Sequence, residues 1–434
     1  MTVRGPSQGE EERRRSVWQG LRRHAIDVRP LRHPPYRRLF IGNAVSNLGY
    51  QFTAVAVPVQ MYALTRSSLW VGLLGVAGLV PLIIFAIWGG AVADAVDRRR
   101  LLLASSTLMW ASTLGLLVQA LTRVDSPVLL LLLVAVQATA FAISAPTRMA
   151  IVPRLVEREE IASANTLNST MFNAAMVAGP LGAGLLLVHG GVAAAYAVDA
   201  VAFTVVLWAT VRLPPLPPQT PAVANGERAG WSAVREGFAY LATSPVLVLS
   251  FAIDIAAMVL ALPRALFPEV AEERFGVGAI GWLYAAIAIG SVLAGLTSGW
   301  IGRVHRQGLA LVVAVVVWGL AVGAAGLARS LWLTVALLAV GGAADLISAV
   351  YRQTILQTYV PDALQGRLQG IFMAVVAGGP RLGDLRAGVS AALIGPTAAW
   401  VGGGVAAAVV AAGLALAFPS LLRYTSPPGP ARVA

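Results

Sequence analysis

Charged residues fall into short clusters along this chain, and the stretches between the clusters are apolar. The stretch 69–88, for example, reads LWVGLLGVAGLVPLIIFAIW and holds no charged residue. A helix that rises ~1.5 Å per residue needs ~20 residues to cross ~30 Å of hydrocarbon. The alternation of long apolar runs with short polar segments therefore predicts a helical protein that crosses a membrane many times.

Twelve apolar runs have the length of a membrane-spanning helix. They cover residues 39–63, 69–93, 101–122, 127–147, 165–188, 191–212, 246–268, 280–301, 308–328, 331–351, 367–389 and 396–418. Several of them contain Gly or Pro, which membrane helices tolerate because neighbouring groups satisfy the backbone that is set free. The predicted fold class is therefore an all-α polytopic membrane protein with 12 transmembrane helices.

The longest polar interruption, PPLPPQTPAVANGERAGW at 214–231, is too rich in proline to span the membrane. We interpret it as a linker between two six-helix halves, followed by a surface helix near 231–243. The expected domains are an arginine-rich arm (1–38), an N-terminal half (39–213), the linker with its surface helix (214–245), a C-terminal half (246–420) and a tail (421–434).

The second half of the chain repeats landmarks of the first half at a nearly constant offset. Gly90 and Gly295 are separated by 205 residues, as are Pro58 and Pro263. Further pairs are Arg148 with Arg352 at an offset of 204, and Gly179-Pro180 with Gly379-Pro380 at an offset of 200. Two repeats related by an axis along the membrane normal are an architecture of transporters.

Composition agrees with this class, because 57% of the residues are hydrophobic and only 12% are charged, against about 25% charged residues in soluble domains. All 32 basic residues are arginine. If the N-terminus is cytoplasmic, 25 arginines lie on the inner side, five on the outer side and two within a span. The positive-inside rule therefore predicts a multi-pass protein of the cell (inner or plasma) membrane with both termini in the cytoplasm. The net charge of +12 needs no nucleic-acid partner to explain it.

Several classes of function find no support in the residues. The chain has no cysteine and no lysine, so it contains neither a thiol site nor a Gly-x-x-x-x-Gly-Lys-Ser/Thr phosphate-binding loop. Its four histidines are scattered along loops and the N-terminal arm. We therefore predict no catalytic residues, no metal, no cofactor and no enzymatic activity. A membrane-embedded enzyme or a non-transporting scaffold stays open as an alternative of another class.

The segment between the second and third spans, GGAVADAVDRRR at 89–100, is unusually dense in charge. Gly90, Asp94, Arg98 and Arg99 fit the pattern Gly-x-x-x-Asp-x-x-Gly-Arg-Arg, while Asp97 stands where glycine is usual. GLTSGWIGR at 295–303 is its counterpart in the second half. On these residues the chain resembles a major facilitator superfamily transporter.

Three further stretches resemble the branch of this superfamily that contains enterobactin (siderophore) exporters and related drug exporters. They are RMAIVPRLVEREEIASANTLN (148–168), GPLGAG (179–184) and RQTILQTYVPDALQGRLQG (352–370). The resemblance implies a monomer in the lipid bilayer that exports a small amphipathic molecule by alternating access, coupled to protons. Uptake of a polar solute is the alternative within transport. Related drug exporters often carry an arginine midway along the fourth span, where this chain has Gln137.

The resemblance also implies roles for two sets of residues. One is a gate on the cytoplasmic side, formed by Gly90, Asp94, Asp97, Arg98, Arg99, Gly295, Gly302 and Arg303. The other is a helix-packing motif in the fifth span, formed by Gly179, Pro180, Gly182 and Gly184.

Ionisable residues inside a span are costly and indicate functional sites. Asp254 is the deepest of them, about 12 Å from the inner end of its span. Asp345 and Arg352 lie on one face of the tenth span, and Arg148 ends the fourth. Asp199 lies near the outer end of the sixth span, where we expect hydration to satisfy it.

Two more groups are candidates for the cavity between the halves. Arg381 and Asp384, one helical turn apart, either pair with each other or contact cargo. Asn43, Asn47 and Gln51 form a polar stripe at intervals of four residues, which we expect to face the central cavity. Interhelical packing is the alternative for these amides.

Overall fold

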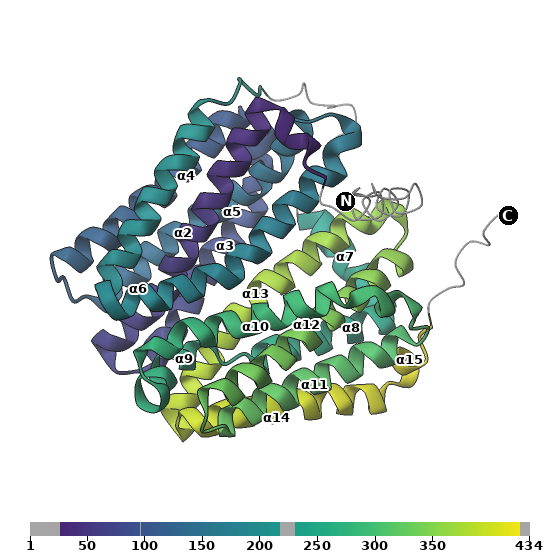
Figure 1. The fold of residues 1–434 in the computed structure, drawn as a ribbon. Coiled ribbons are helices and arrows are strands. Elements are labelled where there is room, and N and C mark those ends of the chain that lie inside the picture. Colours follow the sequence, from purple (N-terminus) through teal and green to yellow (C-terminus); the bar gives the residue numbers. More distant parts are fainter. Residues whose placement is uncertain (1–26, 96, 218–230, 426–434) are drawn as a thin grey trace, which may run out of the picture.

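The computed structural model describes residues 27–95, 97–217 and 231–425, and these residues form helices and no strand (Figure 1). Each of the twelve predicted spans coincides with a helical segment, so the predicted all-α fold class is confirmed. Most helices extend beyond the apolar run that predicted them. The expected arm at 1–38 and linker at 214–231 fall largely outside the described residues.

The first half of the chain contains five long helices in its described part. They are α2 (Pro34–Thr65), α3 (Ser68–Ala95), α4 (Arg98–Leu121), α5 (Pro127–Ile151) and α6 (Ile161–Val211), with short 3₁₀ turns η1 (Arg29–Arg32), η2 (Val152–Arg154) and η3 (Arg158–Glu160). α6 contains two predicted spans, which meet at Gly191. The φ of Gly191 is +66°, a left-handed conformation that glycine adopts at little cost and that breaks the helix.

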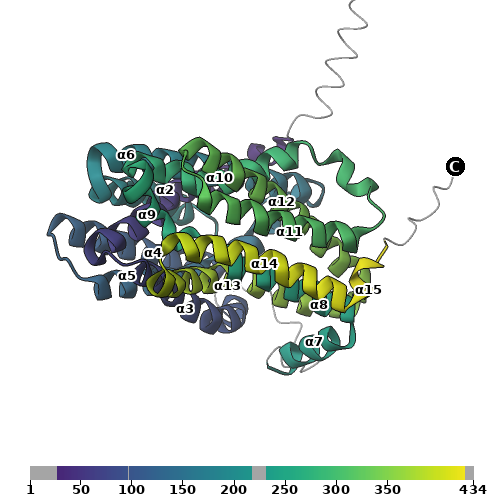
Figure 2. The same ribbon diagram turned by 90° about the horizontal axis from the view of Figure 1, so that it is seen from below.

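The second half begins with the predicted surface helix α7 (Trp231–Thr243), which packs against α13 (Asp362–Ile394) and α8 (Pro245–Ala256) at the edge of the bundle (Figure 2). The long helices that follow are α8 (Pro245–Ala256), α10 (Ile280–Leu296), α11 (Gln307–Leu327), α12 (Leu331–Tyr359), α13 (Asp362–Ile394) and α14 (Pro396–Ala417). The short segments are η4 (Ala257–Ala261), η5 (Arg264–Leu266), α9 (Phe267–Val270), η6 (Ala271–Phe275), η7 (Val277–Ala279), η8 (Ser298–Arg303) and α15 (Pro419–Leu422).

Nine helical stretches in the described chain are long and apolar enough to cross a membrane. One of them, 158–211, holds both spans of α6. The outer surface agrees with contact to lipid, because Leu296, Leu393 and Leu416 are 80%, 79% and 76% exposed. A water-soluble protein seldom exposes large apolar side chains on this scale.

Pro263 interrupts the seventh span. Leu262, which precedes it, has extended backbone dihedrals, as proline imposes on its neighbour, and the helix ends in the π-helical turn η4. Arg386 of α13 donates to the carbonyl oxygens of Val259 (3.1 Å) and Leu260, and to that of Ala399 (3.0 Å). The guanidinium thereby satisfies backbone acceptors at an irregular point inside the protein, which the membrane interior requires.

The helices form two groups that meet along two pairs of helices. In the first group α2 packs against α6, and α5 against α3 and α4; in the second, α11 packs against α12 and α14, and α10 against α12. The contacts between the groups are made mainly by α3 with α13 and by α6 with α10 (Figure 1).

Candidate functional site

The contact between α3 and α13 depends on glycine. A Cβ atom on Gly72 would lie 2.6 Å from the carbonyl oxygen of Asp384, and Gly75 and Gly388 lie equally close to the facing backbone. Backbones approach this closely in membranes where small residues line the interface. The contact uses the first half of α3 and the second half of α13.

The contact between α6 and α10 is built in the same way. A Cβ on Gly184 would lie 2.7 Å from the Cα of Gly281, and a Cβ on Gly281 would lie 2.6 Å from the carbonyl oxygen of Pro180. The other two members of the predicted packing motif face α2: Gly182 contacts Phe52, and Gly179 lies against Gln51.

Polar contacts join the halves at the same end of the helices. Arg66, at the end of α2, forms an ion pair with Glu272 of η6. The hydroxyl of Ser68, at the start of α3, donates to the carboxylate of Glu269 in α9. α9 lies at the opposite end of the second half from α7 and α15 (Figure 1). We call Arg66, Ser68, Glu269 and Glu272 the outer contact.

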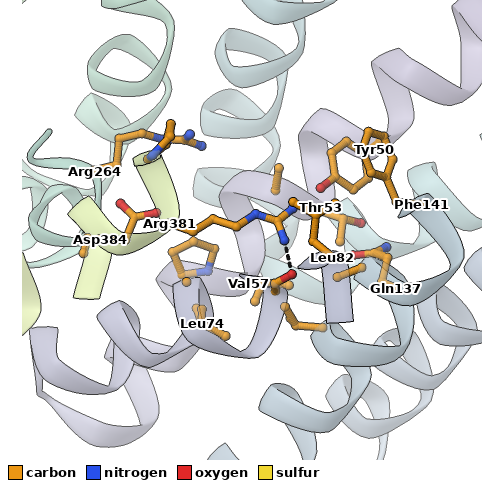
Figure 3. Close-up of a pocket in the computed structure, with 18 of the residues that line it drawn as sticks. Tyr50, Thr53, Val57, Leu74, Leu82, Gln137, Phe141, Arg264, Arg381 and Asp384 are labelled. Atoms are coloured by element: carbon orange, nitrogen blue, oxygen red, sulfur yellow. Dashed lines mark hydrogen bonds between the residues drawn. The ribbon is translucent and has the colours of Figure 1, made fainter. Parts of the chain in front are cut away.

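A pocket of about 430 Å³ lies between the halves (Figure 3), within the size range of small-molecule sites. Its aromatic lining residues are Tyr50, Phe141, Phe172 and Tyr284; its polar and charged lining residues are Thr53, Gln137, Arg264, Arg381 and Asp384. Aliphatic side chains and glycines of α2, α3, α5 and α13 complete the wall. Sequence reasoning found Arg381 and Asp384 but missed the aromatic residues and Arg264, because helix periodicity does not show which face meets the other half.

Arg381 and Asp384 do not form an ion pair with each other, so the first of the two alternatives for them is not what the structure shows. The guanidinium of Arg381 instead donates to the carbonyl oxygen of Gly78 on α3, across the boundary between the halves (Figure 3). Oδ1 of Asp384 is buried without a hydrogen-bond partner among the described residues. Both residues line the pocket, where the second alternative had placed them.

Arg264 and Tyr284 form the part of the wall next to Asp384. The guanidinium carbon of Arg264 lies 5.7 Å from the centre of the Tyr284 ring, a distance that suits a cation–π contact. The hydroxyl of Tyr284 donates to the carbonyl oxygen of Arg264 at 3.3 Å. The charged side of the pocket thus belongs to the second half.

On the other side of the pocket, Thr53 and Gln137 lead to a carboxyl group behind the wall. The Thr53 hydroxyl donates to Oδ2 of Asp199 at 2.5 Å, and the Thr113 hydroxyl donates to the same oxygen at 3.3 Å. The Gln137 amide donates to the Thr113 hydroxyl at 3.4 Å. Asp199 is 0% exposed, so the expectation that hydration satisfies it is wrong.

Asp254 and Arg352 form a buried ion pair between α8 and α12, with side chains that are 3% and 6% exposed. Asp345, which lies on the same helix as Arg352, is not part of this ion pair. The two residues share a helix, but Arg352 turns to a carboxylate on another helix. Asp345 is half-buried. The pair lies within the second half, and neither member lines the pocket described above.

Arg148 holds the corresponding place in the first half but has no acidic partner there among the described residues. Its Nε atom is buried without a hydrogen bond. At offsets of 204 and 205 residues, the positions that correspond to Asp254 are Tyr50 and Gly49, and neither is acidic. The repeat is therefore conserved in its helices but not in this ion pair.

The amide stripe of α2 lies against α6. Nδ2 of Asn47 is 3.9 Å from the sulfur of Met171, and Nε2 of Gln51 is 2.7 Å from the sulfur of Met176. Asn43 is buried, and none of the three lines the pocket described above. The contacts of Asn47 and Gln51 agree with the packing alternative.

The predicted gate is described only in part, because the surroundings of Gly90 and the side chain of Asp94 lie outside what the structure describes. Asp97 caps α4 by accepting hydrogen bonds from the backbone of Arg99 (2.9 Å) and Arg100 (3.1 Å), as a residue before a helix does. Arg98 donates to the carbonyl oxygen of Ala150 (3.1 Å).

The counterpart of this gate in the second half is open to solvent. Gly302 and Arg303 are exposed in the turn η8. Gly295 lies near Leu346, at a pocket between α6 and α10. No group of acidic residues and histidines suited to a metal occurs in the part of the chain that the structure describes.

Solved structures with the same arrangement of helices are transporters. The nucleoside transporter NupG superposes with a TM-score of 0.69 at 15% identity, covering 90% of this chain and 99% of that chain. A bacterial homologue of the iron transporter ferroportin, in an inward-facing state, superposes with a TM-score of 0.67 at 14% identity, covering 90% and 98%. The fold is that of a major facilitator transporter.

Sequence comparison gives the family within that fold. A family model described as transmembrane secretion effector matches residues 26–426, and the chain belongs to this family. The enterobactin exporter EntS of Shigella boydii is 29% identical over 405 residues, which cover 91% of this chain and 94% of that protein. EntS of Escherichia coli O139:H28 matches with the same identity and coverage.

Proposed function

We propose that this protein exports a small amphipathic molecule, either a siderophore of the catecholate class or a drug-like compound, by alternating access. The observation that carries the proposal is the pocket between the halves, whose wall combines four aromatic rings with two arginines. Aromatic rings bind flat apolar groups, and guanidinium groups donate to phenolate or carboxylate oxygens and stack on rings. Similarity to enterobactin exporters over 91% of the chain supports the same class of cargo.

We further propose that the halves move about the contacts described above. With both termini in the cytoplasm, as the arginine distribution predicts, the outer contact lies on the external side and closes it. The structure is then the inward-facing state, in which cargo enters from the cytoplasm. Breaking the outer contact opens the opposite side. In this proposal the domain boundaries at 39–213 and 246–420 delimit the two moving bodies.

Coupling to protons belongs to the proposal as well, and its support is the resemblance to proton-coupled exporters of the superfamily. Asp254, the deepest carboxylate within a span, is one candidate for the group that carries the proton. Its partner Arg352 compensates its charge in this state, so a role in coupling requires the pair to separate during the cycle. The gate residues around Asp97 and Arg98 are proposed to order the cytoplasmic side.

The test uses inside-out membrane vesicles with an inward-acidic pH gradient and follows the uptake of enterobactin beside that of a lipophilic cationic dye. We expect gradient-dependent accumulation of one of them, and a reduction of at least tenfold in Arg381→Gln, because this guanidinium lines the pocket. The control Arg329→Gln changes an exposed arginine and should transport like the wild type. If neither compound moves while right-side-out vesicles take up a polar solute, the direction and the cargo class are both wrong.

A further inference from the structure

We propose that Asp199 is the proton-binding site of this transporter and that Thr53, Thr113 and Gln137 link it to the cargo pocket. The proposal rests on the proposed function, because it names the residue that couples export to protons. Its basis is the cluster behind the pocket wall, which contains a fully buried carboxyl group whose hydrogen bonds end at two residues of the pocket lining.

A negative charge on the Asp199 carboxyl group would have no cation to compensate it among its hydrogen-bond partners. Both of its hydrogen bonds come from neutral hydroxyl groups, and both reach Oδ2. Oδ1 is buried with no hydrogen-bond partner among the described residues, and it lies beside Gly49, where a Cβ would be 3.0 Å away. A buried carboxylate without a cation is costly, and a proton removes that cost, so in this proposal Asp199 is neutral in the state that the structure shows.

The neighbouring helices bring no charge to this site. In α4, the arginines are confined to the first turn, and the last of them precedes Thr113 by thirteen residues, about 20 Å along the helix. In α2 and α6, the titratable residues nearest in the chain to Thr53 and Asp199 are tyrosines. The charged residue of α5 is Arg148, in the last turn of that helix. These tyrosines are Tyr50, which lines the pocket, Tyr62, and Tyr196, whose hydroxyl donates to Gln60 at 2.7 Å.

Asp199 differs in this respect from the ion pair of the second half. The guanidinium of Arg352 compensates Asp254 within the protein, so that pair has no need of a proton. Asp199 alternates between a neutral form in the dry site and an ionised form that requires water or a rearranged wall.

The link to cargo is direct, because Thr53 and Gln137 belong to the wall that cargo touches. When cargo binds and redirects the Thr53 hydroxyl or the Gln137 amide, the hydrogen bonds around Oδ2 of Asp199 change. Binding free energies are reciprocal, so cargo and proton alter each other's affinity by the same factor. In export by antiport, the O–H bond of the carboxyl breaks as cargo binds and the proton passes to water on the cytoplasmic side. A proton from the external side restores the neutral group after cargo leaves.

The test reconstitutes the full chain in liposomes and compares two modes of enterobactin transport. Exchange of labelled for unlabelled compound needs no net proton movement, whereas accumulation driven by a pH gradient does. We expect Asp199→Asn to keep exchange within about twofold of the wild type and to lose gradient-driven accumulation. The control Asp125→Asn alters an exposed loop carboxylate and should keep both modes. If Asp199→Asn accumulates enterobactin like the wild type, the proposal is overturned.

Infrared difference spectroscopy supplies a second readout that does not depend on transport. The wild type at neutral pH should show the C=O stretching band of a protonated carboxyl group that folded Asp199→Asn lacks. This comparison decides the case if the variant loses exchange as well: a band missing from the variant supports the proposal, and identical spectra overturn it. If the wild type moves no enterobactin, the proposed cargo is wrong, and the infrared comparison still decides the role of Asp199.

Discussion

The buried ion pair between Asp254 and Arg352 allows a quantitative prediction. Because the side chains are only 3% and 6% exposed, substitution of one partner leaves the other charge buried without compensation. Loss of one member of such a pair costs about 3–5 kcal/mol. At roughly 2–4 °C per kcal/mol for a unit of 150–250 residues, Asp254→Asn or Arg352→Gln should lower the unfolding temperature by roughly 6–20 °C.

The double variant separates this mechanism from a general loss of packing. Replacement of both charges by apolar groups of similar volume is often neutral or stabilising, so Asp254→Leu with Arg352→Met should be much closer to the wild type than either single variant. The assay is thermal unfolding of the purified protein in detergent, with Asp125→Asn as the exposed control. The reasoning is refuted if the free energy of unfolding of the single variants lies within about 1 kcal/mol of the wild type, which is the range of surface ion pairs. It is also refuted if the double variant loses as much stability as the two single variants together.

Three further predictions concern contacts elsewhere. The chain has no native cysteine, so Ser68→Cys combined with Glu269→Cys should form a single disulfide across the outer contact. This disulfide should stop transport until a reductant is added. Unchanged transport in the cross-linked protein would contradict the proposed motion. Gly184→Val should weaken the α6–α10 contact and reduce transport at least tenfold, because its Cβ would lie 2.7 Å from the Cα of Gly281. The control Gly402→Ala adds a methyl group in open space and should be neutral. Equal activity of the two variants would speak against a close contact at Gly184. Arg386→Gln should destabilise the protein by about 2–5 kcal/mol in thermal unfolding, because three backbone carbonyls lose a charged donor. The control Arg423→Gln changes an exposed arginine and should alter the unfolding temperature little. Equal unfolding temperatures of the two variants would exclude a role for Arg386 in the break of the seventh span.

Hydrophobic patterning was enough to locate the helices. An apolar segment of about twenty residues that crosses a membrane must satisfy its own backbone hydrogen bonds, and a helix does so. The structure differs mainly at helix ends. α12 extends eight residues beyond its predicted run, to Tyr359, since polar residues continue a helix outside the hydrocarbon. The break of α6 at Gly191 agrees with the boundary drawn between two spans.

The pocket was harder to predict. Arg381 and Asp384 stand out as charges inside an apolar run, and the structure places both in the pocket wall. Tyr50, Phe141 and Tyr284 give no such signal, because aromatic residues occur on every face of a membrane helix. Thr53 and Gln137 are ordinary packing residues until the face that they occupy is known.

The class of this protein can be read from local properties of the chain: apolar runs long enough to span, a repeat at an offset near 205 residues, and the charged motif at 89–100. Which charges meet depends instead on how the helices pack. Arg352 pairs with Asp254, 98 residues earlier in the chain, and not with Asp345, seven residues earlier on its own helix. Asp199 was predicted to lie near water and is fully buried. The rotation of each helix about its axis sets these contacts, and that rotation follows from how glycine-lined surfaces pack between helices, which a single helix's pattern does not contain.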